Sequence, residues 1–251
     1  MVWMMFGVIG IPIKKLLNLN ATQFGLLTAT PVLTGSLIRV PLGIWTDRYG
    51  GRIVMTLLMA ATVPAIWVMA YATAYWHFLV IGLFVGLAGG SFSVGTPYVA
   101  RWFPSNRQGM AMGIYGAGNS GSAVNKFIAP VLLVAFGWSI VPQVYAAIMA
   151  GAVILFWFFS FSDPTHLVTT RVKFSEQLKT LKDPKVLKYC QYYSIVFGGY
   201  VALSLWMVQY YVGEFGLEIR SAALLAACFS LPGGVFEQLV VGCQINGALT
   251  A

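Results

Sequence analysis

Three polar side chains lie inside apolar stretches of the chain, where a polar group needs a specific reason to be present. Arg39 and Lys126 are cations away from the loops, and Asn119 is an amide in the middle of an apolar stretch. A guanidinium inside a membrane usually faces a polar cavity or a partner, and its planar fork of donors suits oxyanions. No acid lies in any complete apolar stretch of the sequence. Arg39 is therefore predicted to bind an anion, with a structural pairing to a carbonyl or an acid as the alternative.

The surroundings of these side chains refine the prediction. Gly35 and Gly43 lie four residues before and after Arg39, so they share its helix face and leave room for a ligand to reach it. Asn119 needs a hydrogen-bond partner in another helix or in a ligand. Lys126 is a candidate for an anion or proton step, although snorkelling or pairing with polar backbone is the favoured interpretation.

Other kinds of site have little support. His77 and His166 stand alone, without a second metal ligand nearby, and no nucleophile–base pair or carboxylate pair is visible. Gly116–Gly121 matches the pattern G-x-G-x-x-G, but a dinucleotide site needs a preceding strand, and these residues lie inside an apolar stretch. Three cysteines are too few for a disulfide framework. We expect no enzyme activity, no metal and no cofactor.

The elements that position these residues are membrane helices. Residues of the set AVILMFWYC make up 59% of the 251-residue chain and charged residues only 9%, whereas a soluble domain is about half apolar and a quarter charged. This composition excludes a soluble enzyme, a nucleic-acid-binding domain and a disordered chain. The 27 glycines and 15% aromatic residues are typical of packed membrane helices. An all-α membrane protein is expected, with the lipid bilayer as a partner.

Eight apolar stretches approach the length of about 20 residues that a spanning helix needs. Six of them precede a polar segment and two follow it. The order predicts an N-terminal six-helix bundle at 1–161, a linker at 162–188 and an incomplete C-terminal bundle at 189–251. The stretches are Val2–Ile13, Phe24–Trp45, Ile53–Tyr71, Phe78–Ala100, Gly109–Phe136, Val141–Phe161, Tyr189–Val212 and one that begins near Ser221.

The distribution of lysine and arginine predicts the topology. If the spans alternate, ten of these residues fall on one side, in the loops after the second, fourth and sixth spans, and three fall on the other. The N-terminus and the 162–188 loop are therefore expected in the cytoplasm, and the net charge of +8 needs no nucleic acid to explain it. Within that loop, Phe174, Leu178 and Leu181 are spaced for a helix on the inner membrane surface. A solvated linker is an equally good interpretation.

The loop between the second and third stretches carries a recognisable pattern. It reads Gly43-Ile44-Trp45-Thr46-Asp47-Arg48-Tyr49-Gly50-Gly51-Arg52, which resembles the G-x-x-x-D-R-x-G-x-R signature of the major facilitator superfamily. The resemblance implies a major facilitator-type helix bundle, with a six-helix N-terminal half and the first two helices of the C-terminal half. It also implies that the loop clamps the cytoplasmic side and gates alternating access through Gly43, Asp47, Arg48, Gly50 and Arg52.

Within that superfamily, the chain is most similar to the nitrate/nitrite porter family. The similarity lies in Leu37-Ile38-Arg39-Val40-Pro41, Gly89-Gly90-Ser91-Phe92, Gly116-Ala117-Gly118-Asn119-Ser120-Gly121 and Tyr193-Ser194-Ile195-Val196-Phe197-Gly198-Gly199. It implies that Arg39 binds nitrate or nitrite, that Asn119 hydrogen-bonds it, and that Phe92 and Phe197 close on it with Tyr193 nearby. Lys126, Ser120 and Gly118 are accessory candidates. A bacterial inner membrane is implied, and a coupling proton and a counter-anion are both open.

The chain departs from that family near its end. The family has twelve spans and a second arginine in the eighth, whereas here Leu231–Phe236 is followed by Glu237 in the position of that arginine. Codons for residues 236–246, read with a one-base shift, can encode the family's continuation, so we expect a truncation with a frameshift after Phe236. The short first stretch indicates an incomplete N-terminus. Two alternatives stay open: a facilitator for another small anion or organic solute, and a non-transporting membrane fragment.

Overall fold

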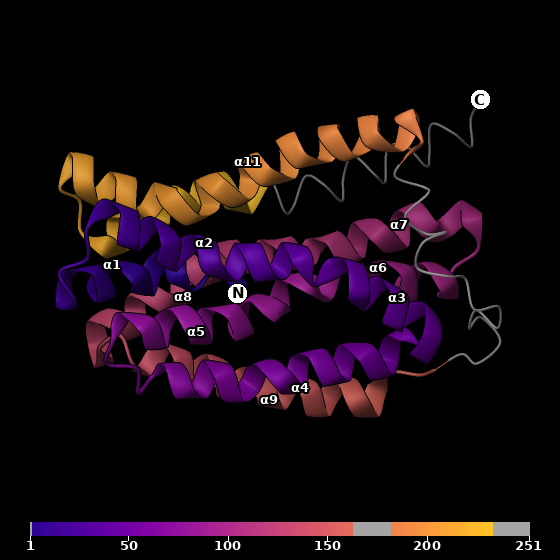
Figure 1. Cartoon of the computed structure of the whole chain (residues 1–251), viewed down its shortest axis with the longest axis horizontal. Coiled ribbons are helices and arrows are strands. Elements are labelled where there is room, and N and C mark those ends of the chain that lie inside the picture. Colours follow the sequence, from indigo (N-terminus) through magenta and orange to yellow (C-terminus); the bar gives the residue numbers. More distant parts are fainter. Residues whose placement is uncertain (1, 163–181, 233–251) are drawn as a thin grey trace.

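The computed structural model describes residues 2–162 and 182–232, and these residues form a bundle of long helices (Figure 1). No strand occurs within these two ranges. The α-helices are α1 (Phe6–Leu16), α2 (Ala21–Leu37), α3 (Arg39–Tyr49), α4 (Gly51–Met69), α5 (Tyr75–Gly86), α6 (Ser91–Trp102), α7 (Ser105–Gly116), α8 (Gly121–Phe136), α9 (Ile140–Phe159) and α11 (Pro184–Phe215), followed by a helix at Ile219–Pro232. Short 3₁₀ helices lie at η1 (Val2–Met4), η2 (Leu87–Gly90) and η3 (Ala117–Ser120).

Among the described residues, five helical segments are long and apolar enough to cross a membrane. They are Ala21–Tyr49, Gly51–Met69, Tyr75–Trp102, Ile140–Phe159 and Pro184–Phe215, and Ile219–Pro232 is a shorter apolar helix. The prediction of an all-α membrane bundle is confirmed. One boundary differs, because α11 begins at Pro184, inside the predicted linker. The predicted surface helix with Phe174, Leu178 and Leu181, and the tail with Phe236 and Glu237, lie outside the described residues.

Three of the predicted spans are interrupted at mid-length. The second breaks at Ile38, between α2 and α3, the fourth at η2 and the fifth at η3. A 3₁₀ stretch inside a helix often marks strain or a functional position, and non-helical backbone at membrane depth is tolerated where it is buried in protein or lines a cavity.

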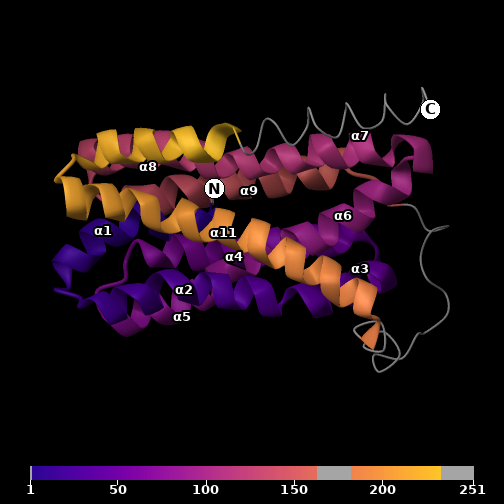
Figure 2. The same ribbon diagram turned by 90° about the horizontal axis from the view of Figure 1, so that it is seen from above.

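The helices run side by side along the long axis of the bundle (Figures 1 and 2). α4 packs along α9, α2 along α5 and α3 along α6, while α11 packs against α1. Lipid tails are as apolar as these helices, so close packing contributes much of the attraction between them. The residues at the crossings must therefore be small or well fitted.

Glycines allow helices to approach one another closely. A Cβ atom on Gly86 would lie 2.6 Å from the backbone oxygen of Pro31, and one on Gly89 would lie 2.7 Å from Trp3 Cε2 and 3.0 Å from the Cα atom of Gly35. Real Cβ contacts are essentially never closer than 3.0 Å, so these positions need glycine. The high glycine content, expected for packed membrane helices, thus has a direct packing role at Gly86 and Gly89.

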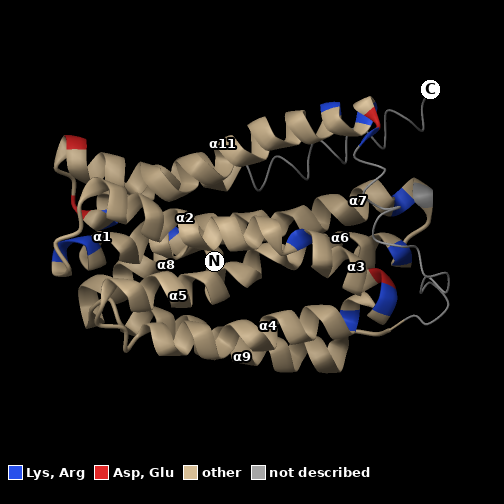
Figure 3. Ribbon diagram, in the orientation of Figure 1, with Lys and Arg blue, Asp and Glu red and all other residues tan. Residues whose placement is uncertain are grey.

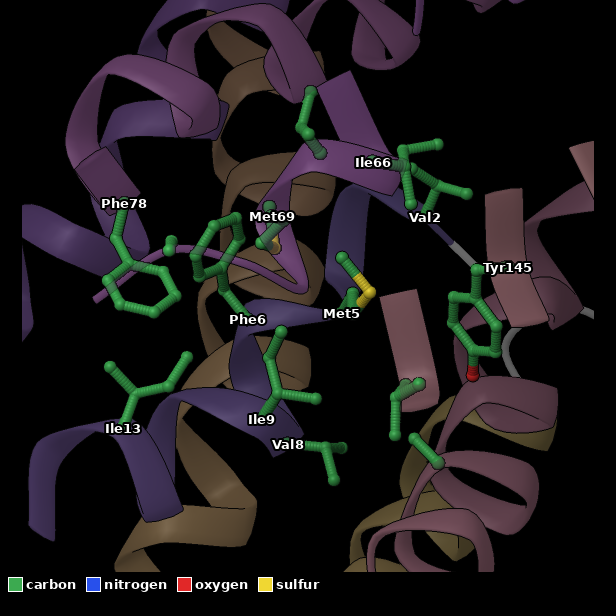
Figure 4. Close-up of a cluster of buried hydrophobic side chains, with 14 of the residues drawn as sticks. Val2, Met5, Phe6, Val8, Ile9, Ile13, Ile66, Met69, Phe78 and Tyr145 are labelled. Atoms are coloured by element: carbon green, nitrogen blue, oxygen red, sulfur yellow. The ribbon is translucent and has the colours of Figure 1, made fainter. Parts of the chain in front are cut away.

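The short first span lies at the centre of the core (Figure 4). Phe6 and Ile9 of α1 are fully buried. The end of η1 is fixed by a buried polar pair: Asn125 Nδ2 donates to the carbonyl oxygen of Met4 at 3.1 Å, and Asn125 Oδ1 accepts from the Tyr145 hydroxyl at 2.7 Å. These bonds satisfy polar groups that would be costly in an apolar interior.

Charged side chains gather at the two ends of the bundle (Figure 3). We call the end that carries Asp47–Arg52 and Arg101–Arg107 the basic end, and the end with the turns at 17–20, 70–74, 137–139 and 216–218 the far end. Lys14, Lys15 and Glu214 lie toward the far end. Each position along a helix therefore lies nearer to one or the other of these two ends.

Candidate functional site

A cavity of about 250 Å³ lies beside the interrupted spans. Its wall brings together four of the predicted substrate residues, Arg39, Phe92, Asn119 and Phe197, from segments far apart in the sequence. The wall also includes Trp3, Ala88, Gly89, Ser91, Tyr115, Gly118, Ser122 and Tyr200. The sequence prediction that these four side chains share one site thus agrees with their placement, and their roles in binding stay a prediction.

Arg39 is the cation of this cavity. It begins α3, directly after the break at Ile38, and its Nε donates to the carbonyl oxygen of Gly89 at 3.4 Å. The centre of its guanidinium lies 5.2 Å from the ring centroid of Phe197 and 6.0 Å from that of Trp3. No acid in the described part of the chain pairs with it. Since Arg carries five N–H donors, most of them remain for a ligand.

The space beside Arg39 differs from the prediction in one respect. Gly35 packs against Trp3 and the backbone of Gly86 and Gly89, so it leaves no room for a ligand, and that part of the prediction is wrong. A Cβ atom on Gly43, by contrast, would meet nothing within 4 Å. Access to the guanidinium comes from the cavity and from a second pocket between α2 and α11 that also contacts Arg39.

Aromatic rings from α6 and α11 line the cavity. Phe92, the second residue of α6, lies 5.1 Å from the Tyr115 ring, centroid to centroid. Phe197, on α11, stacks on Tyr193 with centroids 5.1 Å apart. Tyr193 itself is half exposed and lines the second pocket instead of the cavity. Tyr193 therefore contacts a residue of the cavity wall, Phe197, without lining the cavity itself, and its role stays a prediction.

A group of hydroxyls and carbonyls forms the wall around Asn119. The Asn119 carbonyl oxygen accepts from Ser122 Oγ at 3.0 Å and from the Tyr200 hydroxyl at 3.3 Å. Ser122 Oγ and Tyr200 Oη lie 2.6 Å apart. Asn119 lies in η3, the 3₁₀ stretch between α7 and α8. The fifth span therefore supplies polar groups at the cavity without a charged residue.

Lys126 lies deeper in the protein than predicted. Its side chain is only 2% exposed, and its Nζ donates to Ser230 Oγ at 2.6 Å. The predictions that Lys126 snorkels or pairs with backbone are both wrong, because the side chain is buried and its amine donates to a side chain of the Ile219–Pro232 helix. Lys126 does not line the cavity.

The other two accessory candidates have different surroundings. Gly118 lines the cavity, and a Cβ atom there would meet no atom within 4 Å. Ser120 Oγ donates to the carbonyl oxygen of Ala117 within η3 and is not part of the cavity wall. Gly118 therefore determines the free space of the site, whereas Ser120 stabilises the break.

The predicted gating loop lies at the basic end. Asp47 and Arg48 belong to the last turn of α3 and Arg52 to the first turn of α4, so only Gly50, with φ 86°, forms the turn itself. This corrects the expectation that Asp47 lies in a loop.

Its charged side chains contact neighbouring helices. Asp47 forms an ion pair with Arg101 of α6. Arg52 donates to the Trp157 carbonyl oxygen of α9 at 2.7 Å, and its guanidinium lies 4.4 Å from the Trp157 ring centroid. Arg48 lies over the Tyr49 ring, 5.2 Å from its centroid. Two of the charges thus join helices of the N-terminal bundle at the basic end.

Among the cavity-wall residues not foreseen from the sequence, four carry an aromatic ring or a hydroxyl: Trp3, Tyr115, Ser122 and Tyr200. Aromatic residues and serines are common throughout apolar stretches of this chain, so nothing in composition singled them out. The spacing of Ser122, three residues after Asn119, was the one available signal, because residues three apart lie on the same helix face.

A bundle of apolar helices long enough to cross a membrane, with a cavity lined by Arg39 and several aromatic rings, defines a multi-pass membrane protein. The chain belongs to the Major Facilitator Superfamily, whose family model matches residues 1–242. The predicted resemblance to this superfamily is confirmed.

Curated relatives refine the comparison. The chain is 40% identical over 247 residues to the probable nitrate/nitrite antiporter NarK1 of Thermus thermophilus, covering 94% of this chain and 56% of the relative. It is 33% identical to the nitrite extrusion protein of Bacillus subtilis, covering 91% of this chain and 58% of the relative. It is 32% identical to the probable nitrate transporter NarT of Staphylococcus epidermidis, covering 89% of this chain and 59% of the relative. The predicted similarity to nitrate/nitrite porters is confirmed, and the chain spans less than two thirds of these relatives.

Proposed function

We propose that the protein moves nitrate, nitrite or both across a membrane by alternating access. The observation that carries the proposal is the guanidinium of Arg39 at the wall of the cavity, with no acidic partner among the described residues. A half-buried cation in an apolar segment without a counter-charge favours an anionic ligand. The names of the relatives from Thermus, Bacillus and Staphylococcus supply the anions nitrate and nitrite.

The cavity suits a small planar anion. Its volume of about 250 Å³ equals the liquid volume of about eight water molecules at ~30 Å³ each, which leaves room for the ion and a few waters. The free N–H groups of Arg39 form a planar fork that matches two oxygens of one oxyanion. Phe92 and Phe197 enclose the ion from two sides, and Asn119 contributes a hydrogen bond.

The basic end is cytoplasmic in this proposal, because lysine and arginine favour that side of a membrane, and the membrane is the bacterial inner membrane. The Asp47–Arg101 pair and the contact of Arg52 with Trp157 clamp this end and open and close with the transport cycle. A coupling proton and an exchanged counter-anion are the two modes that a flux assay distinguishes.

Equilibrium dialysis of the 251-residue chain with ¹⁵N-nitrate and ¹⁵N-nitrite tests the site. Hydrogen bonds to charged groups contribute about 1.5–3 kcal/mol each, so loss of a bidentate pair in Arg39→Ala weakens binding at least tenfold, with about 1.4 kcal/mol for each tenfold. Arg39→Lys keeps the positive charge but lacks the planar fork of donors, so its affinity for the anion should lie between those of the unsubstituted chain and of Arg39→Ala. Lys185→Ala, at an exposed position of α11, is the matched control.

The outcomes separate the alternatives. Equal nitrate affinity in Arg39→Ala and the unsubstituted chain would refute the assignment of the site. Competition by chloride or formate as strong as by nitrite would favour a facilitator for another small anion or organic solute. Binding without flux in proteoliposomes would favour a non-transporting membrane fragment.

A further inference from the structure

Lys126 is a buried amine that the proposed anion site does not use. Its Nζ donates to Ser230 Oγ at 2.6 Å, and Ser230 Oγ donates to the Ala226 carbonyl oxygen at 3.0 Å. Lys126 lies on α8 and Ser230 on the Ile219–Pro232 helix. The bond therefore joins the N-terminal group of helices to the last described helix.

Tyr200 of α11 extends this connection to the cavity. Its hydroxyl lies 2.6 Å from Ser122 Oγ, 3.3 Å from the Asn119 carbonyl oxygen and 3.4 Å from the Ser230 carbonyl oxygen. Ser230 thus contacts both Lys126 and Tyr200. Together these bonds link η3 and α8 with the two helices that follow residue 183, at one place beside the cavity.

The connection lies on the far-end side of the cavity. α8 runs from η3 to the turn at Gly137, and Lys126, seven residues after Asn119, is roughly 10 Å further along at 1.5 Å per residue. A buried apolar cluster follows in the same direction, which we call the far-end seam: Ile11, Val208, Ala222, Ala223 and Ala226.

The two halves of α11 differ in burial. Val201, Ser204, Leu205 and Val208 are buried, and Gly7 of α1 lies so near Leu205 that a Cβ there would be 3.1 Å from its carbonyl oxygen. Residues 184–199, toward the basic end, are mostly exposed in the described chain. The helix groups are therefore held together on the far-end side of the cavity.

We propose that Lys126 is a positioning residue that keeps the far-end seam closed by holding Ser230 and, through it, Tyr200. The proposal rests on the proposed alternating access, in which the seam must open once in each cycle. The hydrogen bond between Lys126 and Ser230 holds the seam closed, and it breaks when the helices move apart. The apolar seam residues themselves make no directional bond that could fix its register.

Thiol labelling of a seam residue tests this. Val208 is fully buried, so Val208→Cys is placed in a chain whose native cysteines are serines (Cys190→Ser, Cys228→Ser, Cys243→Ser), in nanodiscs, and treated with a water-soluble methanethiosulfonate. Labelling is expected to be slow. Ser230→Ala and Lys126→Ala each raise the rate at least tenfold, which corresponds to about 1.4 kcal/mol, and Lys126→Arg keeps it low.

A second buried position separates opening of the seam from general loosening. Val85→Cys, in α5 within the N-terminal core and equally buried, should label at an unchanged rate in every variant. The proposal is overturned if Val208→Cys labels at the same rate with and without the Ser230 hydroxyl, or if Val85→Cys accelerates equally. Labelling requires no nitrate, so a failure of the anion site in the dialysis assay is seen separately.

Discussion

Replacing Gly86 by alanine is expected to force α5 away from α2. The added Cβ would lie 2.6 Å from the Pro31 carbonyl oxygen, 2.9 Å from Pro31 Cα and 2.9 Å from Thr34 Cβ. Two of these atoms are backbone, which cannot rotate away as a side chain does. Overpacking costs about 1–3 kcal/mol, and three simultaneous overlaps favour the upper end.

The preference of helices for alanine opposes this cost by about 1 kcal/mol. The net loss in the free energy of unfolding is therefore about 2 kcal/mol, or roughly thirtyfold in the ratio of folded to unfolded protein. The Pro31 carbonyl oxygen also accepts from Trp3 Nε1 at 3.0 Å. A shift of α2 should thus change tryptophan fluorescence at the cavity wall as well.

Equilibrium unfolding in mixed micelles, with increasing SDS and detection by circular dichroism, measures this loss. Gly199→Ala is the matched control, because Gly199 lies inside α11 and a Cβ there would meet nothing within 4 Å. It should leave stability unchanged or raise it by up to about 1 kcal/mol. Equal stability of the Gly86 and Gly199 variants would refute the argument that close backbone approach requires Gly86.

The remaining predictions concern the ion pair at the basic end and the cavity. Asp47→Asn removes the ion pair with Arg101. The Asp47 side chain is 43% exposed and the Arg101 side chain 22%, so the SDS titration should show a loss in the free energy of unfolding of no more than about 1 kcal/mol. A loss above ~3 kcal/mol would mean that the pair acts as a buried one. Phe197→Ala removes the ring 5.2 Å from the Arg39 guanidinium and should lower nitrate affinity about fivefold. Tyr210→Ala, on the same helix, should leave it unchanged, and equal affinities in both variants would contradict a role for the Phe197 ring.

Hydrophobicity alone was sufficient to predict the helical bundle. Each predicted span overlaps a helical segment of the described chain, because the cost of unpaired backbone in lipid leaves few alternatives to a helix. The interruptions at Ile38, η2 and η3 were not predicted. Hydropathy averages over about 19 residues, and a four-residue change of backbone conformation leaves that average unaltered.

The cavity was predictable where a residue was unusual for its surroundings. Arg39 and Asn119 are polar groups in apolar segments, and both line the cavity. Tyr200 and Ser122 carry hydroxyls that an apolar helix accommodates easily, so only the fold brings them together at 2.6 Å. Lys126 was misjudged for a related reason, because the direction of its side chain depends on where the Ile219–Pro232 helix packs.

The interruptions and the cavity have one physical cause in common. A broken helix leaves carbonyl groups without an N–H partner in the same helix, and a membrane protein must satisfy them from elsewhere. At and beside the breaks of this protein, side chains donate to backbone carbonyls: the Gly89 carbonyl accepts from Arg39, the Ser91 carbonyl from Tyr115, and the Asn119 carbonyl from Ser122 and Tyr200.

Each of these donors lines the same cavity as the carbonyl that it contacts. The breaks therefore position the polar side chains, and the side chains stabilise the breaks. A substitution that restores a regular helix at η2 or η3 should disorder the site even when every residue of the cavity wall is retained.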